Sequence, residues 1–134
     1  MKKRAKLFQL ILAVLSRYSQ VQLCIVYGSF ASGTATEKSD VDLAIACDSE
    51  LSVEKRMEIA LQLSSCLGCE VDLVDLNRLN GLLLSEILTH GKILIKKSDE
   101  IYAQFVKRHL YYQADFRPLF DRILKIRRER FIHG

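Results

Sequence analysis

Apolar residues along this chain gather in short runs separated by polar and glycine-containing stretches, a pattern that predicts alternating helices and strands. Four runs of aliphatic and β-branched residues are short enough to be strands, at 22–27, 41–47, 70–75 and 92–96. Apolar residues three and four positions apart predict helices at about 3–18, from 29, at 51–67 and at 78–89. This order predicts an α/β fold, a small mixed sheet backed by helices on one side.

The chain continues beyond the last predicted strand as a helical segment. We divide the single domain into a core, residues 1–97, and a helical C-terminal extension, residues 98–134. Apolar residues at helical spacing over 98–116 predict packing on the chain's own sheet. Pro118 should kink or restart the helix. An apolar stripe continues beyond it and suggests docking on another protein, at Leu119, Ile123, Ile126 and Phe131.

The net charge of +4 is concentrated at the C-terminal end. Residues 1–104 carry 12 basic and 13 acidic side chains, whereas residues 105–134 carry 8 basic and 3 acidic ones. This basic segment suits contact with RNA or with an acidic partner surface. A solvated helix face accounts for the same pattern, so direct nucleic-acid binding stays open.

Length and composition narrow the class of protein. A chain of 134 residues, 49% hydrophobic and 27% charged, has the composition of one globular domain. No run reaches the roughly 18 consecutive apolar residues of a membrane span, and the N-terminal apolar stretch, broken by Gln9, favours an amphipathic helix over a signal peptide. We therefore expect a cytoplasmic protein. Its cysteines should be reduced, because Cys66-x-x-Cys69 lacks the second pair or histidines of a zinc site.

The first candidate for chemistry is the turn at Gly28 and Ser29. An apolar run, Leu23–Tyr27, ends at Gly28, which predicts a buried strand entering a tight turn. Gly28 lets the backbone approach a ligand closely, and Ser29 adds a hydroxyl at the start of a helix whose free N–H groups attract anions. This corner suits the phosphates of a nucleotide.

Two carboxylates follow on the next predicted strand. Asp40 and Asp42 are two residues apart, so in a strand they project from the same face. Adjacent carboxylates repel each other, and Mg²⁺ prefers carboxylate and phosphate oxygens. The pair therefore favours a metal-linked nucleotide site, although a solvated Asp-x-Asp at a strand start has the same sequence.

A third acid, Asp72, lies within the next predicted strand. If that strand lies beside the Asp40–Asp42 strand, Asp72 can reach the same metal and serve as the base for an attacking hydroxyl. Glu70 shares its face and is a weaker candidate for the role. Asp75 points to the opposite face and is interpreted as the strand's exit or a helix cap.

Taken together, Gly28-Ser29, ten residues, Asp40-x-Asp42 and the later Asp72 resemble the minimal nucleotidyltransferases of the DNA polymerase β superfamily. The resemblance covers roughly residues 20–96. The small size is similar to that of the MNT antitoxins encoded beside HEPN-domain toxins in prokaryotes. The resemblance implies the polymerase-β-like nucleotidyltransferase fold.

It further implies an adenylyltransferase that uses ATP and Mg²⁺ to attach AMP to a tyrosine of the partner HEPN toxin, which silences the toxin's ribonuclease activity. Asp40, Asp42 and Asp72 would be the catalytic and metal-binding residues, and Gly28, Ser29, Asp40 and Asp42 would bind the nucleotide. Two other functions stay open: an antitoxin that neutralises by stoichiometric binding alone, and a nucleotidyltransferase that acts on a small molecule or on RNA.

Overall fold

The computed structural model describes residues 2–36, 39–110 and 122–127. Its centre is a four-stranded sheet in the order β3-β2-β1-β4. The strands are β1 (Val21–Tyr27), β2 (Val41–Cys47), β3 (Val71–Asp75) and β4 (Lys92–Lys96). β1 pairs antiparallel with both β2 and β4, whereas β3 pairs parallel with β2. The predicted mixed sheet is therefore confirmed, with strand boundaries that differ by no more than one residue.

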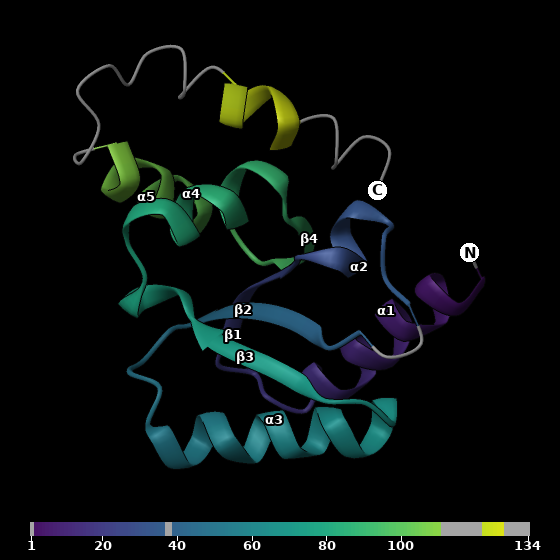
Figure 1. Ribbon diagram of the computed structural model, residues 1–134. Helices are drawn as coiled ribbons and strands as arrows, with labels where there is room; N and C mark the ends of the chain where they lie inside the picture. The colour runs from purple at the N-terminus through teal and green to yellow at the C-terminus, as the bar shows by residue number, and fades with distance from the viewer. Residues whose placement is uncertain (1, 37–38, 111–121, 128–134) are drawn as a thin grey trace.

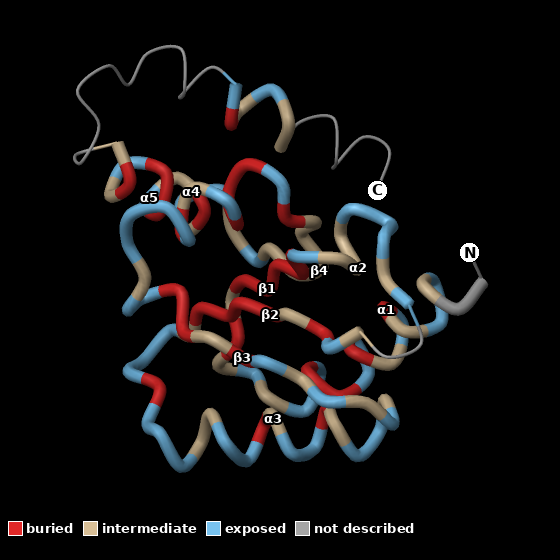
Figure 2. The backbone as a smooth tube through the Cα atoms, in the orientation of Figure 1, coloured by how far each residue is buried: buried red, intermediate tan, exposed pale blue. Residues whose placement is uncertain are grey.

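Helices cover both faces of this sheet, so the expectation of helices on one side was wrong. α1 (Lys2–Leu15) and α3 (Val53–Leu67) lie on one face, and α4 (Gly81–His90) and α5 (Asp99–Leu110) lie on the other (Figure 1). The reason lies in the central strands β1 and β2, which are buried along most of their length (Figure 2). Leu23 and Ile25 join one core, and Cys24 and Val26 join the other. A strand that is apolar on both sides needs a cover on each.

Side-chain caps set the starts of α3 and of the 3₁₀ turn that follows β3. α3 begins at Val53 because the Ser52 hydroxyl accepts a hydrogen bond from the Lys55 N–H at 3.1 Å. The prediction of a helix over 78–89 was wrong at its start. A 3₁₀ turn, η1 (Leu76–Arg78), comes first, and α4 begins at Gly81. Asp75 caps η1, since its Oδ1 accepts from the Asn77 N–H at 2.9 Å. The prediction that Asp75 is a cap is thus confirmed.

The C-terminal extension packs on the chain's own core in the part that the structure describes. Tyr102, Phe105 and Val106 of α5 are buried against the sheet, and the Tyr102 hydroxyl donates to the Leu88 carbonyl at 3.0 Å. The predicted packing of residues 98–116 is confirmed as far as Leu110.

Residues 122–127 form a further helical segment, and Ile123 within it is fully buried in the same core as α5. Arg127 pairs with Asp99 and lies over the Tyr102 ring, 5.3 Å from its centroid. The interpretation of Ile123 as a docking residue for another protein was therefore wrong. Pro118, Leu119 and Phe131 lie outside the described residues.

Two properties predicted from composition can be compared with the described part of the chain. None of its helices combines the length and the apolar character needed to cross a bilayer. All four cysteines are free thiols, and burial raises the pKa of Cys24 to about 12 and that of Cys47 to about 11. Thiols of this kind stay protonated and unreactive at neutral pH.

Candidate active site

The turn after β1 has the geometry that its sequence predicts. Gly28 has φ +70° and ψ −148°, a backbone conformation that is essentially restricted to glycine. The short helix α2 (Ser29–Ser32) follows at once, and Gly33 ends it with φ +81°. The N–H groups of Ala31 and Ser32 both donate to the Gly28 carbonyl at 3.1 Å. The expected strand, tight turn and short helix are therefore confirmed.

Gly28 lies directly against the carboxylate of Asp42. A Cβ added to Gly28 would stand well inside contact distance of Oδ2 of Asp42, so any other residue here would force the carboxylate to move. The antiparallel register brings this about, because Tyr27 at the end of β1 pairs with Asp42 near the start of β2. The register of the two strands thus brings the Gly28 turn next to the Asp42 carboxylate, although the two are 14 positions apart in the sequence.

Asp72 adjoins Asp42 from the other side. The two residues are partners in the parallel β2–β3 register, so their side chains leave the sheet on the same face. This is the face covered by α4 and α5, because Ala44 and Val74, two residues further along each strand, pack in the core on that side. Asp42 is half-buried and Asp72 is exposed. The expectation that these two strands are neighbours is confirmed.

The electrostatics of Asp42 reflect this crowding. Burial raises the pKa of the Asp42 carboxyl, and the nearby charges of Asp72 and then Asp40 raise it further. Asp40 is exposed and immediately precedes β2. Its charge also acts on Cys69, whose thiol pKa is raised first by burial and then by Asp40. The charges of two other acids therefore act on Asp42.

Tyr27 is a member of the site that reasoning from the sequence missed. Its ring is 8% exposed, and burial together with the charges of Asp72 and Asp42 raises its pKa to about 12. The hydroxyl is therefore a protonated hydrogen-bond donor at neutral pH. The sequence feature that could have identified Tyr27 is its position as the last residue of the strand, directly before Gly28 and opposite the predicted acids.

The acids do not form a ready-made metal cluster. Across residues 2–36, 39–110 and 122–127, no three Asp, Glu, His or Cys side chains stand in an arrangement that would hold an ion as they are. The donor chemistry nevertheless fits Mg²⁺, a hard cation that takes carboxylate oxygens and is often completed by substrate phosphates and water. A cation would also relieve the repulsion that raises the pKa of Asp42.

The other acids near β3 have separate positions. Asp75 caps η1 and forms an ion pair with Arg78 at 3.8 Å, which accounts for its burial. Glu70 is exposed, and its carbonyl accepts from the Val41 N–H at 2.9 Å, where β3 and β2 first meet. Asp75 is thus a structural residue, whereas Glu70 has no side-chain contact within the described ranges that favours it over Asp72.

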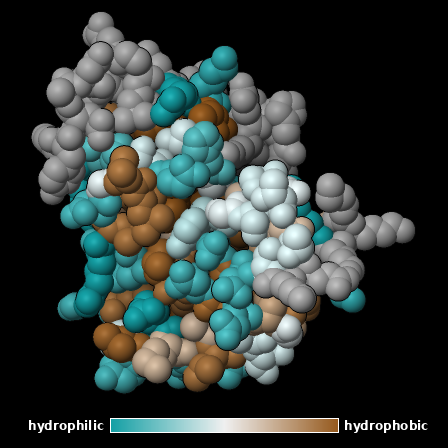
Figure 3. Space-filling view, in the orientation of Figure 1, coloured by the Kyte–Doolittle hydropathy of each residue, from teal (hydrophilic) through white to brown (hydrophobic). Residues whose placement is uncertain are grey.

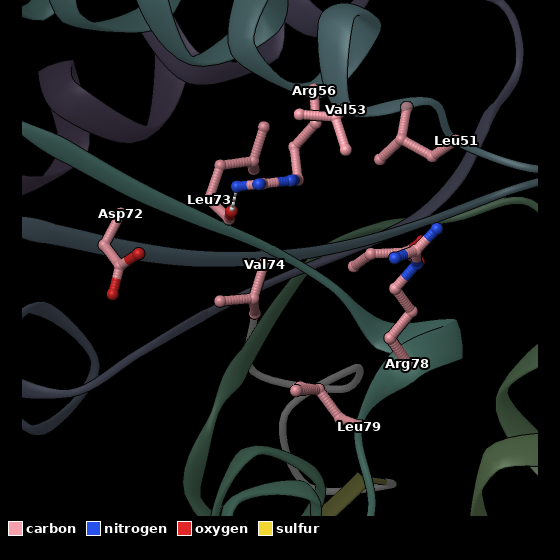
Figure 4. A pocket seen from close by; sticks show the side chains of 9 residues that line it. Leu51, Val53, Arg56, Asp72, Leu73, Val74, Arg78 and Leu79 are labelled. Atoms are coloured by element: carbon pink, nitrogen blue, oxygen red, sulfur yellow. Dashed lines mark hydrogen bonds and ion pairs between the residues drawn. The ribbon is translucent and has the colours of Figure 1, made fainter.

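A groove runs along the free edge of β3 next to Asp72. Its volume is about 280 Å³, and apolar residues from three segments form most of its lining, namely Leu51, Val53, Leu73, Val74 and Leu79. Asp72 stands at one end and Arg78 at the other, while the Arg56 guanidinium donates to the Leu73 carbonyl at 3.1 Å (Figure 4). The groove lies on the side of Asp42 opposite to Gly28, because β2 separates β3 from β1.

The surface beyond the groove also carries apolar side chains. Figure 3 shows apolar groups over the start of α4 and along α3. Leu82 is 89% exposed, and on α3 a row at spacings of four residues is open to solvent, namely Val53, Met57 and Leu61. Exposed apolar rows of this kind are common at surfaces where proteins associate.

A glycine–serine corner facing acids on adjacent strands of a mixed sheet defines the class of the protein as nucleotidyltransferase-like. The family model described as polymerase beta nucleotidyltransferase matches residues 9–100. The chain belongs to this family. The matched region includes β1 to β4 and all of the acids discussed above.

Proteins that are similar to this chain have descriptions that fit this family. A protein adenylyltransferase, MntA, from Shewanella oneidensis is 32% identical over 108 residues, 78% of each chain. A chain in a crystal structure of a toxin–antitoxin with AMP-PNP is similar with a TM-score of 0.70 and 27% identity, covering 87% of this chain and 98% of that one. A third similar chain comes from a structure of the tri-AMPylated Shewanella oneidensis HEPN toxin in complex with MNT antitoxin. Its TM-score is 0.67 and its identity 26%, and the match covers 90% of this chain and 98% of that one.

Proposed function

We propose that this protein is an antitoxin adenylyltransferase, which transfers AMP from ATP to a tyrosine hydroxyl of a partner HEPN ribonuclease toxin and thereby neutralises the toxin. The observation that carries the proposal is the contact of Gly28 with Asp42 and the pairing of Asp42 with Asp72, in a chain 32% identical to a protein adenylyltransferase. The AMP-PNP-bound and tri-AMPylated toxin–antitoxin structures of relatives support the choice of nucleotide, partner and modification.

The nucleotide belongs at the corner between β1 and β2. Gly28 and Ser29 would hold the phosphates there, because the glycine turn leaves room for them beside the sheet. The protonated hydroxyl of Tyr27 faces the same acids and is available to donate a hydrogen bond to a phosphate oxygen. Bound in this way, the triphosphate would lie next to Asp42.

The acceptor belongs on the opposite side, next to Asp72. Asp72 is exposed and adjoins the groove at the free edge of β3, which gives an incoming side chain access without displacing the nucleotide. In the reaction, the acceptor oxygen would form a bond to the α-phosphorus as the bond to the β-phosphate breaks and pyrophosphate leaves. Asp72 would take the hydroxyl proton. Holding both reactants on either side of Asp42 is itself a large part of catalysis.

Asp40 and Asp42, with Asp72 beside them, would hold Mg²⁺ together with the phosphate oxygens. When bound, the ion supplies charge neutralisation for the triphosphate and the developing negative charge of the reaction. The three acids themselves would concentrate negative charge at one place on the sheet and so attract the cation there.

The test is to incubate the purified protein with ATP, MgCl₂ and the product of the adjacent gene, which we expect to be the HEPN toxin, and to measure the intact mass of that product. The proposal predicts a gain of one or more AMP units on the toxin, lost when Asp42 is changed to alanine. Neutralisation of the toxin by the Asp42→Ala variant at equimolar amounts, with no gain of mass, would instead favour an antitoxin that works by binding alone.

A further inference from the structure

We infer that Arg4 is a positioning residue for the nucleotide, because it holds the α2 turn from behind. This inference rests on the proposed function, since it assigns a role to the part of the turn that would hold the triphosphate. Arg4 lies on α1, far from Gly28 in sequence and outside the motif that identifies the family. Its Nη2 donates to the Ala31 carbonyl at 3.0 Å, and its Nη1 lies close to Gly33.

The α2 turn is only partly held by packing. No side chain of this four-residue helix is fully buried, although Phe30 packs in part against the core beneath α1 and α3, and positive-φ glycines stand at both ends, Gly28 and Gly33. A segment with so little fully buried surface depends for its position on polar contacts as well. Most of those contacts are internal, such as the bond from the Thr34 N–H to the Ser29 carbonyl at 3.0 Å. Arg4 links the turn to a helix on the opposite face of the sheet from α4 and α5.

Arg4 also contacts an aromatic ring one turn along its own helix, α1. Its guanidinium lies over the Phe8 ring, 5.4 Å from the centroid, and Lys92 lies over the same ring at 5.2 Å. Phe8 is 8% exposed and is part of the core formed by α1 and α3. The Nε of Arg4 is buried and, within the described residues, has no hydrogen-bond partner. The guanidinium therefore contacts the Phe8 ring and the α2 turn together.

This arrangement predicts two consequences of losing the guanidinium. The turn should open more often, because its link to α1 is removed. The triphosphate should then bind less tightly, since part of its binding energy would be used to order the turn. Because a hydrogen bond from a charged donor is lost, triphosphate binding should weaken by about tenfold or more.

The variants are Arg4→Met, which retains an unbranched stem to cover Phe8, and Arg4→Lys, which retains the positive charge. The matched control is Lys6→Ala, because Lys6 is an exposed cation on the same helix. Two quantities are measured: the Kd of AMP-PNP and of AMP with Mg²⁺ by calorimetry, and amide hydrogen exchange of residues 28–36 without nucleotide.

In Arg4→Met we expect AMP-PNP to bind about tenfold more weakly or worse, AMP to bind within about twofold of wild type, and exchange in residues 28–36 to quicken. Arg4→Lys should recover part of the loss, and Lys6→Ala should match wild type. Unchanged exchange in Arg4→Met would overturn the inference even if no nucleotide bound, and so would equal weakening of AMP and AMP-PNP. If the wild-type protein did not bind AMP-PNP, but amide exchange of residues 28–36 still quickened in Arg4→Met, the proposed function would be wrong. The contact of Arg4 with the α2 turn would still stand.

Discussion

Asp42 and Asp72 face each other across the parallel β2–β3 pair, with Asp42 half-buried and Asp72 open to solvent. Burial and the charges of Asp72 and Asp40 raise the pKa of Asp42, so the ionised form of this residue is held at a cost to the folded state. A group that costs stability and is nevertheless placed near two other acids is typical of a functional site. Substitution of Asp42 can therefore show its cost to folding stability separately from its contribution to AMP transfer.

Asp42→Asn should therefore keep or raise the melting temperature while lowering AMP transfer by about a hundredfold or more, as loss of charge stabilisation at an active site does. Asp48→Asn, an exposed acid just beyond β2, is the control and should change neither quantity. Thermal melts and intact-mass assays measure the two effects. A variant that melts several degrees lower yet still transfers AMP would show that Asp42 has a structural role instead.

The same substitution has a pH dependence of known sign. Because folding raises the pKa of Asp42, ionisation favours the unfolded state, and the cost is absent at acidic pH where the carboxyl is protonated in both states. Any gain in stability of Asp42→Asn should thus be present at neutral pH and vanish below the ordinary aspartate pKa of 3.8. Denaturant unfolding of both proteins across this range provides the comparison, and a gain that is constant with pH would contradict it.

Gly28→Ala should be more damaging than an ordinary glycine substitution. The new Cβ would meet both a forbidden backbone conformation, worth roughly 1–3 kcal/mol, and the carboxylate of Asp42. Gly68→Ala is the matched control, because Gly68 also has φ +70° but has no neighbouring atom within 4 Å of an added Cβ. It should lose about 1 kcal/mol of stability and retain AMP transfer. Equal effects of the two substitutions on transfer would mean that the contact with Asp42 is unimportant.

His109 should make the protein less stable in acid. Its ring is fully buried on α5, neither nitrogen has a hydrogen-bond partner in the described part of the chain, and burial lowers its pKa below the ordinary value of 6.5. Protonation then favours the unfolded state, so its contribution is intact above pH 6.5 and is lost as the pH falls towards the lowered pKa. Unfolding midpoints measured from pH 8 to pH 5 should fall less steeply in His109→Phe than in wild type, and parallel curves would refute this.

Arg108 should stabilise the segment that follows β3. Its guanidinium donates to the carbonyls of Leu76, Leu79 and Asn77 at 2.5, 2.8 and 3.0 Å, which ties α5 to η1. Arg108→Ala should lower the free energy of unfolding by about 1–3 kcal/mol, the usual cost of leaving such groups without partners. The exposed neighbour Lys107 provides the control substitution. A loss for Arg108→Ala no larger than for Lys107→Ala would remove this role.

Much of the fold could be predicted because local patterns and the tertiary structure agree. The alternation of apolar runs identified each strand, and the spacing from Gly28 to Asp42 brought the turn and the acid together once β1 and β2 paired. The second helical layer was missed because burial on both faces of a central strand depends on residues elsewhere in the chain, such as Tyr102. Tyr27 was missed for the same reason: its proximity to Asp72 depends on a strand far along the sequence. The position of Arg4 behind the α2 turn also depends on packing between distant elements.

We propose that Gly28, Asp42 and Asp72 form one site for AMP transfer. The most direct measurement is the intact mass of the proposed HEPN toxin partner after incubation with this protein, ATP and MgCl₂, using wild type and the Asp40→Ala/Asp42→Ala double variant. We predict a mass gain of one or more AMP units with wild type and none with the folded double variant. Transfer by the double variant at the wild-type rate would contradict the account.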